Sequence, residues 1–550
     1  MHPLPGYWSC CSLLLLFSLG VQGSPGAPSA APEQVHLSYP GEPGSMTVTW
    51  TTWVPTRSEV QFGLQPSGPL PLRAQGTFVP FVDGGILRRK LYIHRVTLRK
   101  LLPGVQYVYR CGSAQGWSRR FRFRALKNGA HWSPRLAVFG DLGADNPKAL
   151  PRLRRDTQQG MYDAVLHVGD FAYNMDQDNA RVGDRFMRLI EPVAASLPYM
   201  TCPGNHEERY NFSNYKARFS MPGDNEGLWY SWDLGPAHII SFSTEVYFFL
   251  HYGRHLVQRQ FRWLESDLQK ANKNRAARPW IITMGHRPMY CSNADLDDCT
   301  RHESKVRKGL QGKLYGLEDL FYKYGVDLQL WAHEHSYERL WPIYNYQVFN
   351  GSGEMPYTNP RGPVHIITGS AGCEERLTPF AVFPRPWSAV RVKEYGYTRL
   401  HILNGTHIHI QQVSDDQDGK IVDDVWVVSA GRAPPSCIAL IGRGAHRASG
   451  IKRLKLWLHG LCASSGDTPG LPPVLPTGQG HHQPSVSKVA TTVMTLLTSR
   501  WCRGLFLLSA ALRVGLKPGS RFTASGLLPR VPSCLSFPAW HRLIWEEETC

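Results

Sequence analysis

Five short polar motifs, each placed directly after a mainly apolar run, constrain this chain more than any other feature of its sequence. The runs cover residues 136–139, 164–168, 199–201, 280–284 and 326–331. The motifs that follow them lie at residues 140–143, 169–173, 202–207, 285–288 and 332–335. Short continuous apolar runs are typical of strands buried on both faces of a sheet. Because open α/β sheets bind ligands at the carboxyl ends of their strands, we expect the five motifs to converge on one site.

Two patterns of predicted secondary structure occur along the rest of the chain. From residue 135 to about 421, apolar runs, including one at 238–242, alternate with helical patterns around 180–193 and 256–270, which predicts an α/β domain. Before it, short β-rich runs separated by turn signals predict a small β-sandwich, and they lie at residues 46–51, 59–63, 92–98, 106–110 and 120–124. Within that part, residues 102–109 resemble the late strands of a fibronectin type III domain, where a tyrosine beside a turn is typical.

We therefore expect four segments, which are a signal peptide at 1–23, a fibronectin type III-like domain at 32–127, a larger α/β domain at 133–428 and an irregular basic tail at 429–550. The apolar run at 12–20 is too short to span a bilayer and is followed by small residues, as in secretory signal peptides. The tail's most apolar stretch contains three arginines, each costing about 2.5–3.5 kcal/mol at a bilayer centre. No transmembrane segment is therefore predicted, and we expect the tail to be largely disordered.

The net charge of +18 is concentrated at the C-terminal end. Residues 429–550 contain 14 basic and 4 acidic residues, so the tail carries +10 and the first 428 residues only +8. No recognised nucleic-acid module occurs in the sequence. A nucleic-acid partner is therefore not expected.

Cysteines and glycosylation sequons favour the secretory route. Asn-x-Ser/Thr sequons occur at Asn211, Asn350 and Asn404. Outside the signal and the tail there are five cysteines, an odd number without a zinc-type CxxC pair. Cys291 and Cys299 are close enough in the sequence to bridge a loop, which makes them a disulfide candidate. We expect a secreted, extracellular glycoprotein.

The motifs together offer a mixed set of oxygen and nitrogen donors. Each motif alone has an ordinary explanation as a turn, a helix cap or a solvated strand. In order along the chain, the set consists of Asp141, Asp170, Tyr173, Asn205, His286, His333 and His335. Such a set suits two adjacent metal ions, an arrangement common in phosphate-ester hydrolases. Other histidines are expected to be ordinary strand residues, such as His365 in the apolar run 363–367, and His407 and His409, which alternate with isoleucines.

In these motifs the chain resembles the purple acid phosphatases, a branch of the calcineurin-like metallophosphoesterases. The family's ordered motifs GDxG, GDxxY, GNH with an acid, a strand-end His and GHxH match residues 140–143, 169–173, 204–207, His286 and 332–335. The resemblance covers roughly residues 35–428 and implies a fibronectin type III-like β-sandwich followed by a metallophosphoesterase α/β sandwich. Gly143 stands where other metallophosphoesterases have a His ligand, and Ala332 replaces the first Gly of GHxH.

The resemblance implies a role for each donor. A ferric ion would be bound by Asp141, Tyr173 and His335, and a divalent ion, Zn, Mn or Fe, by Asn205, His286 and His333. Asp170 would bridge the two ions. His206 would contact phosphate or protonate the leaving group, and His302 is carried over as a second catalytic candidate although the surrounding loop does not match.

The function implied is a secreted binuclear acid phosphatase that hydrolyses phosphomonoesters through a metal-bound hydroxide. Two alternatives stay open. One is a phosphodiesterase or nucleotide phosphatase on the same fold, and the other is a non-catalytic secreted protein that binds metal or phosphate. The sequence leaves the oligomeric state undetermined, and a homodimer is compatible with it.

Overall fold

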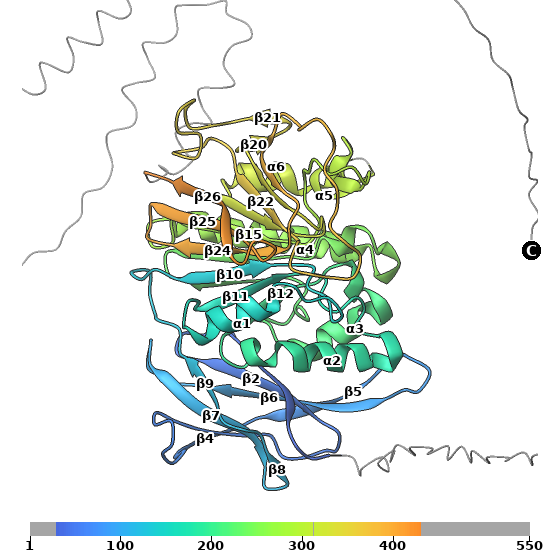
Figure 1. Ribbon diagram of the computed structural model, residues 1–550, viewed down its shortest axis with the longest axis vertical. Helices are drawn as coiled ribbons and strands as arrows, with labels where there is room; N and C mark the ends of the chain where they lie inside the picture. The colour runs from blue at the N-terminus through green and yellow to red at the C-terminus, as the bar shows by residue number, and fades with distance from the viewer. Residues whose placement is uncertain (1–28, 312, 431–550) are drawn as a thin grey trace, which may run out of the picture. The chain divides into compact units, whose positions relative to one another are not determined.

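The structure, a computed structural model, describes residues 29–430 with the exception of residue 312 (Figure 1). The signal peptide expected at 1–23 lies outside the described residues, as does the tail expected at 429–550 apart from Ser429 and Ala430. Within the described part of the chain, no helix is long and apolar enough to cross a membrane.

The N-terminal part of the described chain forms a sandwich of two antiparallel sheets (Figure 1). One sheet has the order β1-β2-β6-β5, and the other has the order β4-β3-β7-β8 with β9 paired to β7. The strands are β1 (Glu33–Ser38), β2 (Met46–Thr52), β3 (Glu59–Gly63), β4 (Leu72–Gln75), β5 (Thr77–Val82), β6 (Lys90–Leu98), β7 (Gln106–Ser113), β8 (Gly116–Trp117) and β9 (Phe121–Arg124).

The sandwich core is aromatic. Trp50, Tyr107, Tyr109 and Phe123 are buried in one apolar cluster between the two sheets. The five β-rich runs seen in the sequence correspond to β2, β3, β6, β7 and β9. The sequence did not predict β5, because five of its six side chains are exposed and it therefore lacks the alternation of a half-buried strand.

The larger domain contains two mixed sheets. The first has the order β12-β11-β10-β24-β25-β26 and the second has the order β13-β14-β15-β18-β22-β19-β23. The strands of the first are β10 (Arg135–Phe139), β11 (Ala164–Val168), β12 (Tyr199–Cys202), β24 (Gly396–Ile402), β25 (His407–Ser414) and β26 (Lys420–Val428). Those of the second are β13 (Tyr230–Leu234), β14 (Ala237–Ser241), β15 (Trp280–Met284), β18 (Leu328–Trp331), β19 (Tyr337–Leu340), β22 (Val364–Thr368) and β23 (Ser388–Val392).

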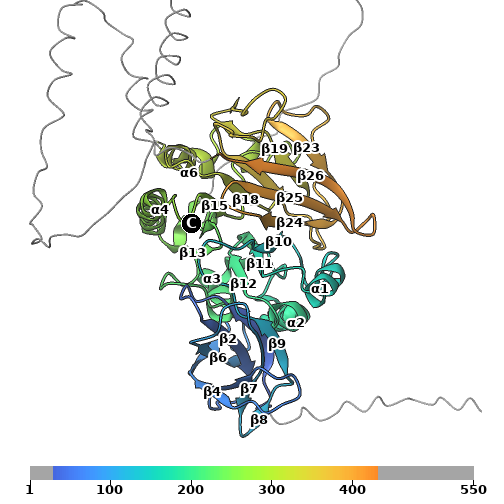
Figure 2. The same cartoon turned by 90° about the vertical axis from the view of Figure 1, so that its left-hand side faces the viewer.

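Helices lie beside both sheets (Figure 2). Helices α1 (Leu150–Gln158), α2 (Gln177–Ala194) and α3 (Arg209–Arg218) lie on the side of the first sheet, and α4 (His255–Lys273) and α6 (Leu317–Lys323) on the side of the second (Figure 2). Short elements complete the chain, and they are η1 (Asn205–Glu207), η2 (Glu245–Tyr247), η3 (Leu250–Tyr252), η4 (Asp298–Thr300), α5 (Lys305–Lys308), β16 (Gly309–Leu310), β17 (Leu314–Tyr315), β20 (Ile343–Tyr344) and β21 (Gln347–Val348).

Burial on both faces explains the continuous apolar runs. Along β10, Leu136 and Val138 belong to the cluster between the two sheets, whereas Ala137 and Phe139 belong to the cluster that includes helix residues. Successive side chains of a strand point to opposite faces, so both sets must be apolar here. The prediction of a β-sandwich followed by an α/β domain is confirmed. As expected, His365 lies on β22 and His407 and His409 lie on β25.

A buried ion-pair network joins the sandwich to the larger domain. The side chains of Arg218 on α3 and Asp184 on α2 are both almost fully buried, with Nη2 of Arg218 2.9 Å from Oδ1 of Asp184. Arg89 of the sandwich donates to the other oxygen of Asp184 at 2.7 Å. Nη1 of Arg218 donates to Oε1 of Gln34 on β1 at 3.0 Å. Each buried charge therefore has partners from both domains.

Replacing Asp184 with alanine (Asp184→Ala) is expected to lower the free energy of unfolding by about 3–5 kcal/mol, because it leaves the buried guanidinium of Arg218 without its charge partner. Urea denaturation measures this loss. The matched control is Asp145→Ala, whose partner Arg185 lies on the same helix but in an exposed pair, and which should cost less than about 1 kcal/mol. Similar losses for the two variants would contradict a stabilising role of the buried network.

Candidate metal centre

The five motifs meet at the carboxyl ends of five strands. Asp141 follows β10, Asp170 and Tyr173 follow β11, and Asn205 follows β12. In the second sheet, His286 follows β15, and His333 and His335 follow β18. Strands β10, β11 and β12 are adjacent and parallel, as are β15 and β18, so their ends lie at shared sheet edges. The structure brings all seven side chains into two groups, and within each group the side chains contact one another.

The first group is formed by Asp141, Tyr173 and His335. The hydroxyl of Tyr173 lies 3.1 Å from Oδ1 of Asp141 and 2.9 Å from Nε2 of His335. That His335 nitrogen is also 3.6 Å from Oδ1 of Asp141. All three residues are buried. Two oxygen donors and one nitrogen donor therefore face one another.

The second group is centred on Nε2 of His286. This atom lies 3.0 Å from Oδ2 of Asp170, 3.1 Å from Oδ1 of Asn205 and 3.2 Å from Nδ1 of His333. Donor atoms of Asp170, His286 and His333 all lie within 4.8 Å of one another. His286 and Asp170 are buried, whereas Asn205 and His333 are partly exposed. The second group is therefore nearer to solvent than the first.

Backbone groups hold the outer sides of these residues. Oδ2 of Asp141 accepts from the N–H of His333, and Oδ1 of Asp170 accepts from the N–H of His206, each at 2.9 Å. Nδ1 of His286 lies 2.9 Å from the carbonyl of Val168, and only an N–H can bond to a carbonyl oxygen. This assignment leaves the lone pair on Nε2 directed into the group, as metal-ligating histidines require.

His335 is held in the same way. Its Nδ1 lies 2.9 Å from the carbonyl of Arg376, so Nδ1 donates and the lone pair of Nε2 faces Tyr173. Both histidines therefore present an acceptor nitrogen to the other donors. The set of carboxylate, amide, phenol and imidazole donors fits two cations of the hard or borderline class.

The electrostatics of the two groups favour bound cations. Burial alone would lower the pKa of His286, but Asp170 and Asp141 raise it to about 10. Burial also acts against His335, whose pKa the nearby Asp141 and Cys373 raise to about 12. In both cases the carboxylates attract positive charge strongly enough to outweigh desolvation. Without an ion each ring holds a second proton, on Nε2, and a bound cation would take the place of that proton.

The phenol of Tyr173 shows the reverse effect. Burial, followed by the charges of Asp141 and Asp170, raises its pKa well above the ordinary value. A tyrosinate therefore forms here only when a cation offsets those carboxylates. For Asp170, burial would raise the pKa, but His286 and His206 hold it well below the ordinary value.

At four of the donor residues the backbone adopts a left-handed conformation, which sets the direction of the side chain. Asp141, Asp170, Tyr173 and His333 have φ of 59°, 52°, 51° and 71°, in the left-handed region that side chains other than glycine rarely adopt. Such conformations cost about 1–3 kcal/mol each and persist only where the surroundings impose them. They cluster at four of the seven donor positions, which sequence patterns did not predict.

Two close approaches depend on small residues. Gly169 has a φ of +83°, and a Cβ at this position would lie 2.4 Å from Nδ1 of His286. A Cβ on Gly140 would lie 2.4 Å from the methyl group of Ala332. Ala332, which replaces the glycine of the resembled motif, is fully buried and has no positive φ, so its methyl group packs against Gly140 without displacing either neighbouring histidine.

Of the two catalytic candidates, only His206 lies beside the donor groups. Its ring packs on Tyr173 with centroids 4.3 Å apart, and its Nε2 is 3.9 Å from Oδ2 of Asp170. The side chain of His302 is 73% exposed and contacts Glu303 and the ring of Tyr346, neither of which belongs to the seven donors. The structure therefore does not bring His302 into the site.

Several neighbours escaped the sequence patterns. Asn174 holds Nδ1 of His206 at 2.6 Å, and Glu375 lies 3.6 Å from its Nε2. Glu207, known from the sequence only as the acid of its motif, accepts from the N–H groups of Asp170, Phe171 and Gly204 at 2.9 Å. Glu207 lies within a motif and Asn174 directly follows one, whereas nothing in the sequence around Glu375 indicates its position.

The loop after His286 is cross-linked. The structure contains the disulfide between Cys291 and Cys299, with Cα atoms 5.4 Å apart. Among the described residues, Cys111, Cys202 and Cys373 are buried free thiols. The sulfur of Cys373 lies 3.3 Å from Nδ1 of His335.

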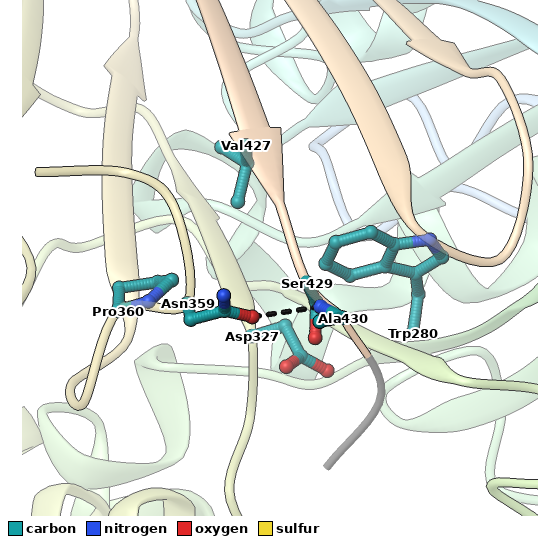
Figure 3. A pocket seen from close by; sticks show the side chains of 7 residues that line it. All are labelled: Trp280, Asp327, Asn359, Pro360, Val427, Ser429 and Ala430. Carbon is teal, nitrogen blue, oxygen red and sulfur yellow. Dashed lines mark hydrogen bonds between the residues drawn. The ribbon is translucent and has the colours of Figure 1, made fainter. Parts of the chain in front are cut away.

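A cavity of about 330 Å³ lies beside the amino-terminal ends of β15 and β18, whose carboxyl ends are followed by the donor residues (Figure 3). It is lined by Trp280, the first residue of β15, and by Asp327, Asn359, Pro360, Val427, Ser429 and Ala430. Oδ1 of Asn359 accepts from the N–H of Ala430 at 2.7 Å, shown as a dashed line in Figure 3. Because His286 follows the other end of β15, this cavity is separate from the donor groups.

Three family models match the chain. They are the calcineurin-like phosphoesterase at residues 134–337, the purple acid phosphatase N-terminal domain at 32–125, and the iron/zinc purple acid phosphatase-like protein C at 362–424. Together they span most of the described residues.

Known proteins agree with these matches. Acid phosphatase type 7 of Homo sapiens is 99% identical over 428 residues, and that of Mus musculus is 86% identical, each match covering 78% of this chain and 98% of the relative. Among solved structures, a purple acid phosphatase from yellow lupin (Lupinus luteus) seeds is similar with a TM-score of 0.62 at 24% identity. That match covers 73% of this chain and 75% of the lupin chain, and it bears on the fold alone.

Proposed function

The chain belongs to the purple acid phosphatase family and is an acid phosphatase of the metallophosphoesterase class, and we propose that it hydrolyses phosphomonoesters with one ferric and one divalent ion. The divalent ion would be Zn, Mn or Fe. The ferric ion would be held by Asp141, Tyr173 and His335, and the divalent ion by Asn205, His286 and His333. Asp170 would serve both.

One observation carries this proposal. Seven donor side chains from five strand ends form two adjoining groups, with acceptor atoms turned inward and the outer sides held by backbone or side-chain bonds. The phenol of Tyr173 lies in the first group, and a phenolate is a hard anionic donor that favours a ferric ion. When bound, the two ions would acidify water and offset charge on the phosphoryl oxygens during in-line displacement.

His206 is proposed to protonate the leaving alkoxide. Oδ1 of Asn174 accepts from its Nδ1–H, which fixes the ring orientation and leaves Nε2 facing Asp170 and Glu375. In that orientation Nε2 donates a proton only when the ring is an imidazolium. The proposed proton transfer therefore requires a proton on Nε2 of His206.

We also propose that the chain follows the secretory route. The sequon residues Asn211 and Asn404 are exposed, and the hydroxyl of Thr406 donates to Oδ1 of Asn404 within one sequon. The Cys291–Cys299 disulfide fits an oxidising compartment. After expression in mammalian cells, the protein should be found in the culture medium, and its apparent mass should fall after peptide N-glycosidase treatment. Protein that stays in the cytosol without glycans would contradict this route.

The substrate class is tested by comparing initial rates on matched phosphate monoesters and diesters. A faster rate on the diester would favour the phosphodiesterase or nucleotide alternative. Full metal content without turnover on either ester would favour a non-catalytic binding protein. The phosphomonoesterase proposal expects the monoester to react faster.

Replacing Tyr173 with phenylalanine (Tyr173→Phe) should abolish the visible charge-transfer band of the purified protein, because the band needs a phenolate bound to the ferric ion. A visible spectrum recorded together with iron analysis measures this. Tyr162→Phe is the control, since Tyr162 is a buried tyrosine whose hydroxyl bonds Tyr397 and Asp156 away from the donor groups. The assignment fails if the Tyr173 variant keeps its band.

Replacing Asp170 with asparagine (Asp170→Asn) should lower kcat by at least about 10³-fold, because the side chain that is proposed to serve both ions loses its charge. Steady-state hydrolysis of a nitrophenyl phosphate measures kcat. Asp145→Asn, a change in an exposed ion pair, should leave the rate unchanged. Full turnover by the Asp170 variant would rule out the two-ion mechanism.

A further inference from the structure

The loop between β15 and α5 brings a carboxylate onto one of the donor histidines. Asp297 lies in this loop, inside the stretch closed by the Cys291–Cys299 disulfide. Its Oδ2 is 2.5 Å from Nε2 of His333. The side chain of Asp297 is 30% exposed and that of His333 is 16% exposed. This contact joins residues 36 positions apart and is not part of any sequence motif.

Nε2 of His333 faces two groups, Oδ2 of Asp297 at 2.5 Å and Nη1 of Arg287 at 2.9 Å. The role of Nδ1 decides which His333 nitrogen carries the proton. Nδ1 of His333 faces the second donor group, 3.2 Å from Nε2 of His286. If Nδ1 supplies a lone pair there, Nε2 must carry the hydrogen, and a carboxylate at 2.5 Å is its acceptor. With Nδ1 bound to an ion, Asp297 therefore holds His333 in the tautomer with a hydrogen on Nε2 and restrains the orientation of its ring.

Asp297 is in turn held by a chain of charges. Nη1 of Arg287 lies 3.4 Å from Oδ2 of Asp297, and Nε of the same guanidinium donates to the fully buried Glu245 at 3.0 Å. The guanidinium of Arg287 thus contacts both carboxylates and also lies 2.9 Å from Nε2 of His333. Such an arrangement restrains the Asp297 side chain against rotation.

The loop backbone is fixed independently of this chain. The carboxylate of Asp298 accepts from the hydroxyl of Ser304 at 2.7 Å and from the N–H of Lys305 at 3.0 Å. On the other side, the N–H of Ala294 donates to the carbonyl of Pro379 and the N–H of Ala381 donates to the carbonyl of Ser292, both at 2.9 Å. These hydrogen bonds therefore hold the loop backbone on both sides of Asp297 in place near His333.

His333 differs in this respect from the other two donor histidines. The outer nitrogens of His286 and His335 face the backbone carbonyls of Val168 and Arg376. Only His333, among these three described residues, has a carboxylate on its outer nitrogen. A carboxylate is the stronger acceptor and raises the basicity of the ligand nitrogen more than a carbonyl does.

From these contacts we propose that Asp297 is a positioning residue that sets the affinity of the second donor group for its divalent ion. The inference rests on the two-ion proposal, because it concerns one of the two sites. It assigns Asp297 no contact with substrate. Its effect should be confined to the ion held by Asn205, His286 and His333.

The test compares Asp297→Asn, Asp297→Glu and Asp295→Asn with the unaltered protein. Zn²⁺ dissociation constants are measured by chelator competition, with iron content and the visible band recorded on the same samples. Asp297→Asn should bind Zn²⁺ about 10–100-fold more weakly while keeping its iron and its band. Asp297→Glu should recover part of the affinity, because it restores a carboxylate. Asp295 is exposed on the same loop, and its Oδ1 lies 3.4 Å from the backbone nitrogen of Asp297. The amide oxygen of Asp295→Asn can still accept from that N–H, so this variant should match the unaltered protein.

Each remaining outcome overturns something specific. An unchanged Zn²⁺ affinity in Asp297→Asn overturns the positioning role. Equal loss of iron and Zn²⁺, or a Zn²⁺ loss equally large in Asp295→Asn, shows a general loop defect and also overturns it. If the unaltered protein binds only one ion, the two-ion proposal fails first, and the inference fails with it.

Discussion

The site is organised around negative charge that is buried at the ends of parallel strands. Asp141 and Asp170 are almost completely buried, and the carboxylate of Glu207 lies directly behind Asp170. Buried carboxylates repel one another in a medium of low dielectric constant, and burial together with the charge of Asp170 raises the pKa of Glu207 to about 8. Backbone N–H groups and the surrounding histidines offset part of that repulsion, and cations would offset the rest. The turned backbone at the donor positions and the small residues Gly140 and Gly169 are consequences of packing these groups so closely.

Much of the fold could be predicted because its central strands are buried on both faces. The continuous apolar runs of β10, β11 and β15 are a direct result of that burial, and a polar motif marks each strand end. Elements without such a signature were predicted poorly. Strand β5 is mostly exposed and was missed. Strands β24, β25 and β26 form an antiparallel meander that no motif follows, and only the alternation around His407 and His409 indicated one of them.

The seven donors could be named from the sequence because each lies within a few residues of a strand end. Asp297 and Glu375 could not be named in this way, because they reach the site from loops whose course depends on tertiary contacts. His302 shows the converse error, a residue that was predicted for the site but lies outside it. It was carried over by resemblance alone, and in this chain its ring stacks on Tyr346 at the surface.

The unequal burial of the two donor groups bears on how ions would enter and leave. Asp141, Tyr173 and His335 are all buried, whereas the other group includes the partly exposed Asn205 and His333. An ion in the buried group exchanges with solvent only when packed side chains open, so its lifetime depends on local unfolding. An ion in the outer group needs only a rearrangement around two side chains. The two positions would therefore exchange their ions on different timescales. The occupancy of the inner position would reflect the metal available during folding, whereas that of the outer position would follow later changes in metal availability.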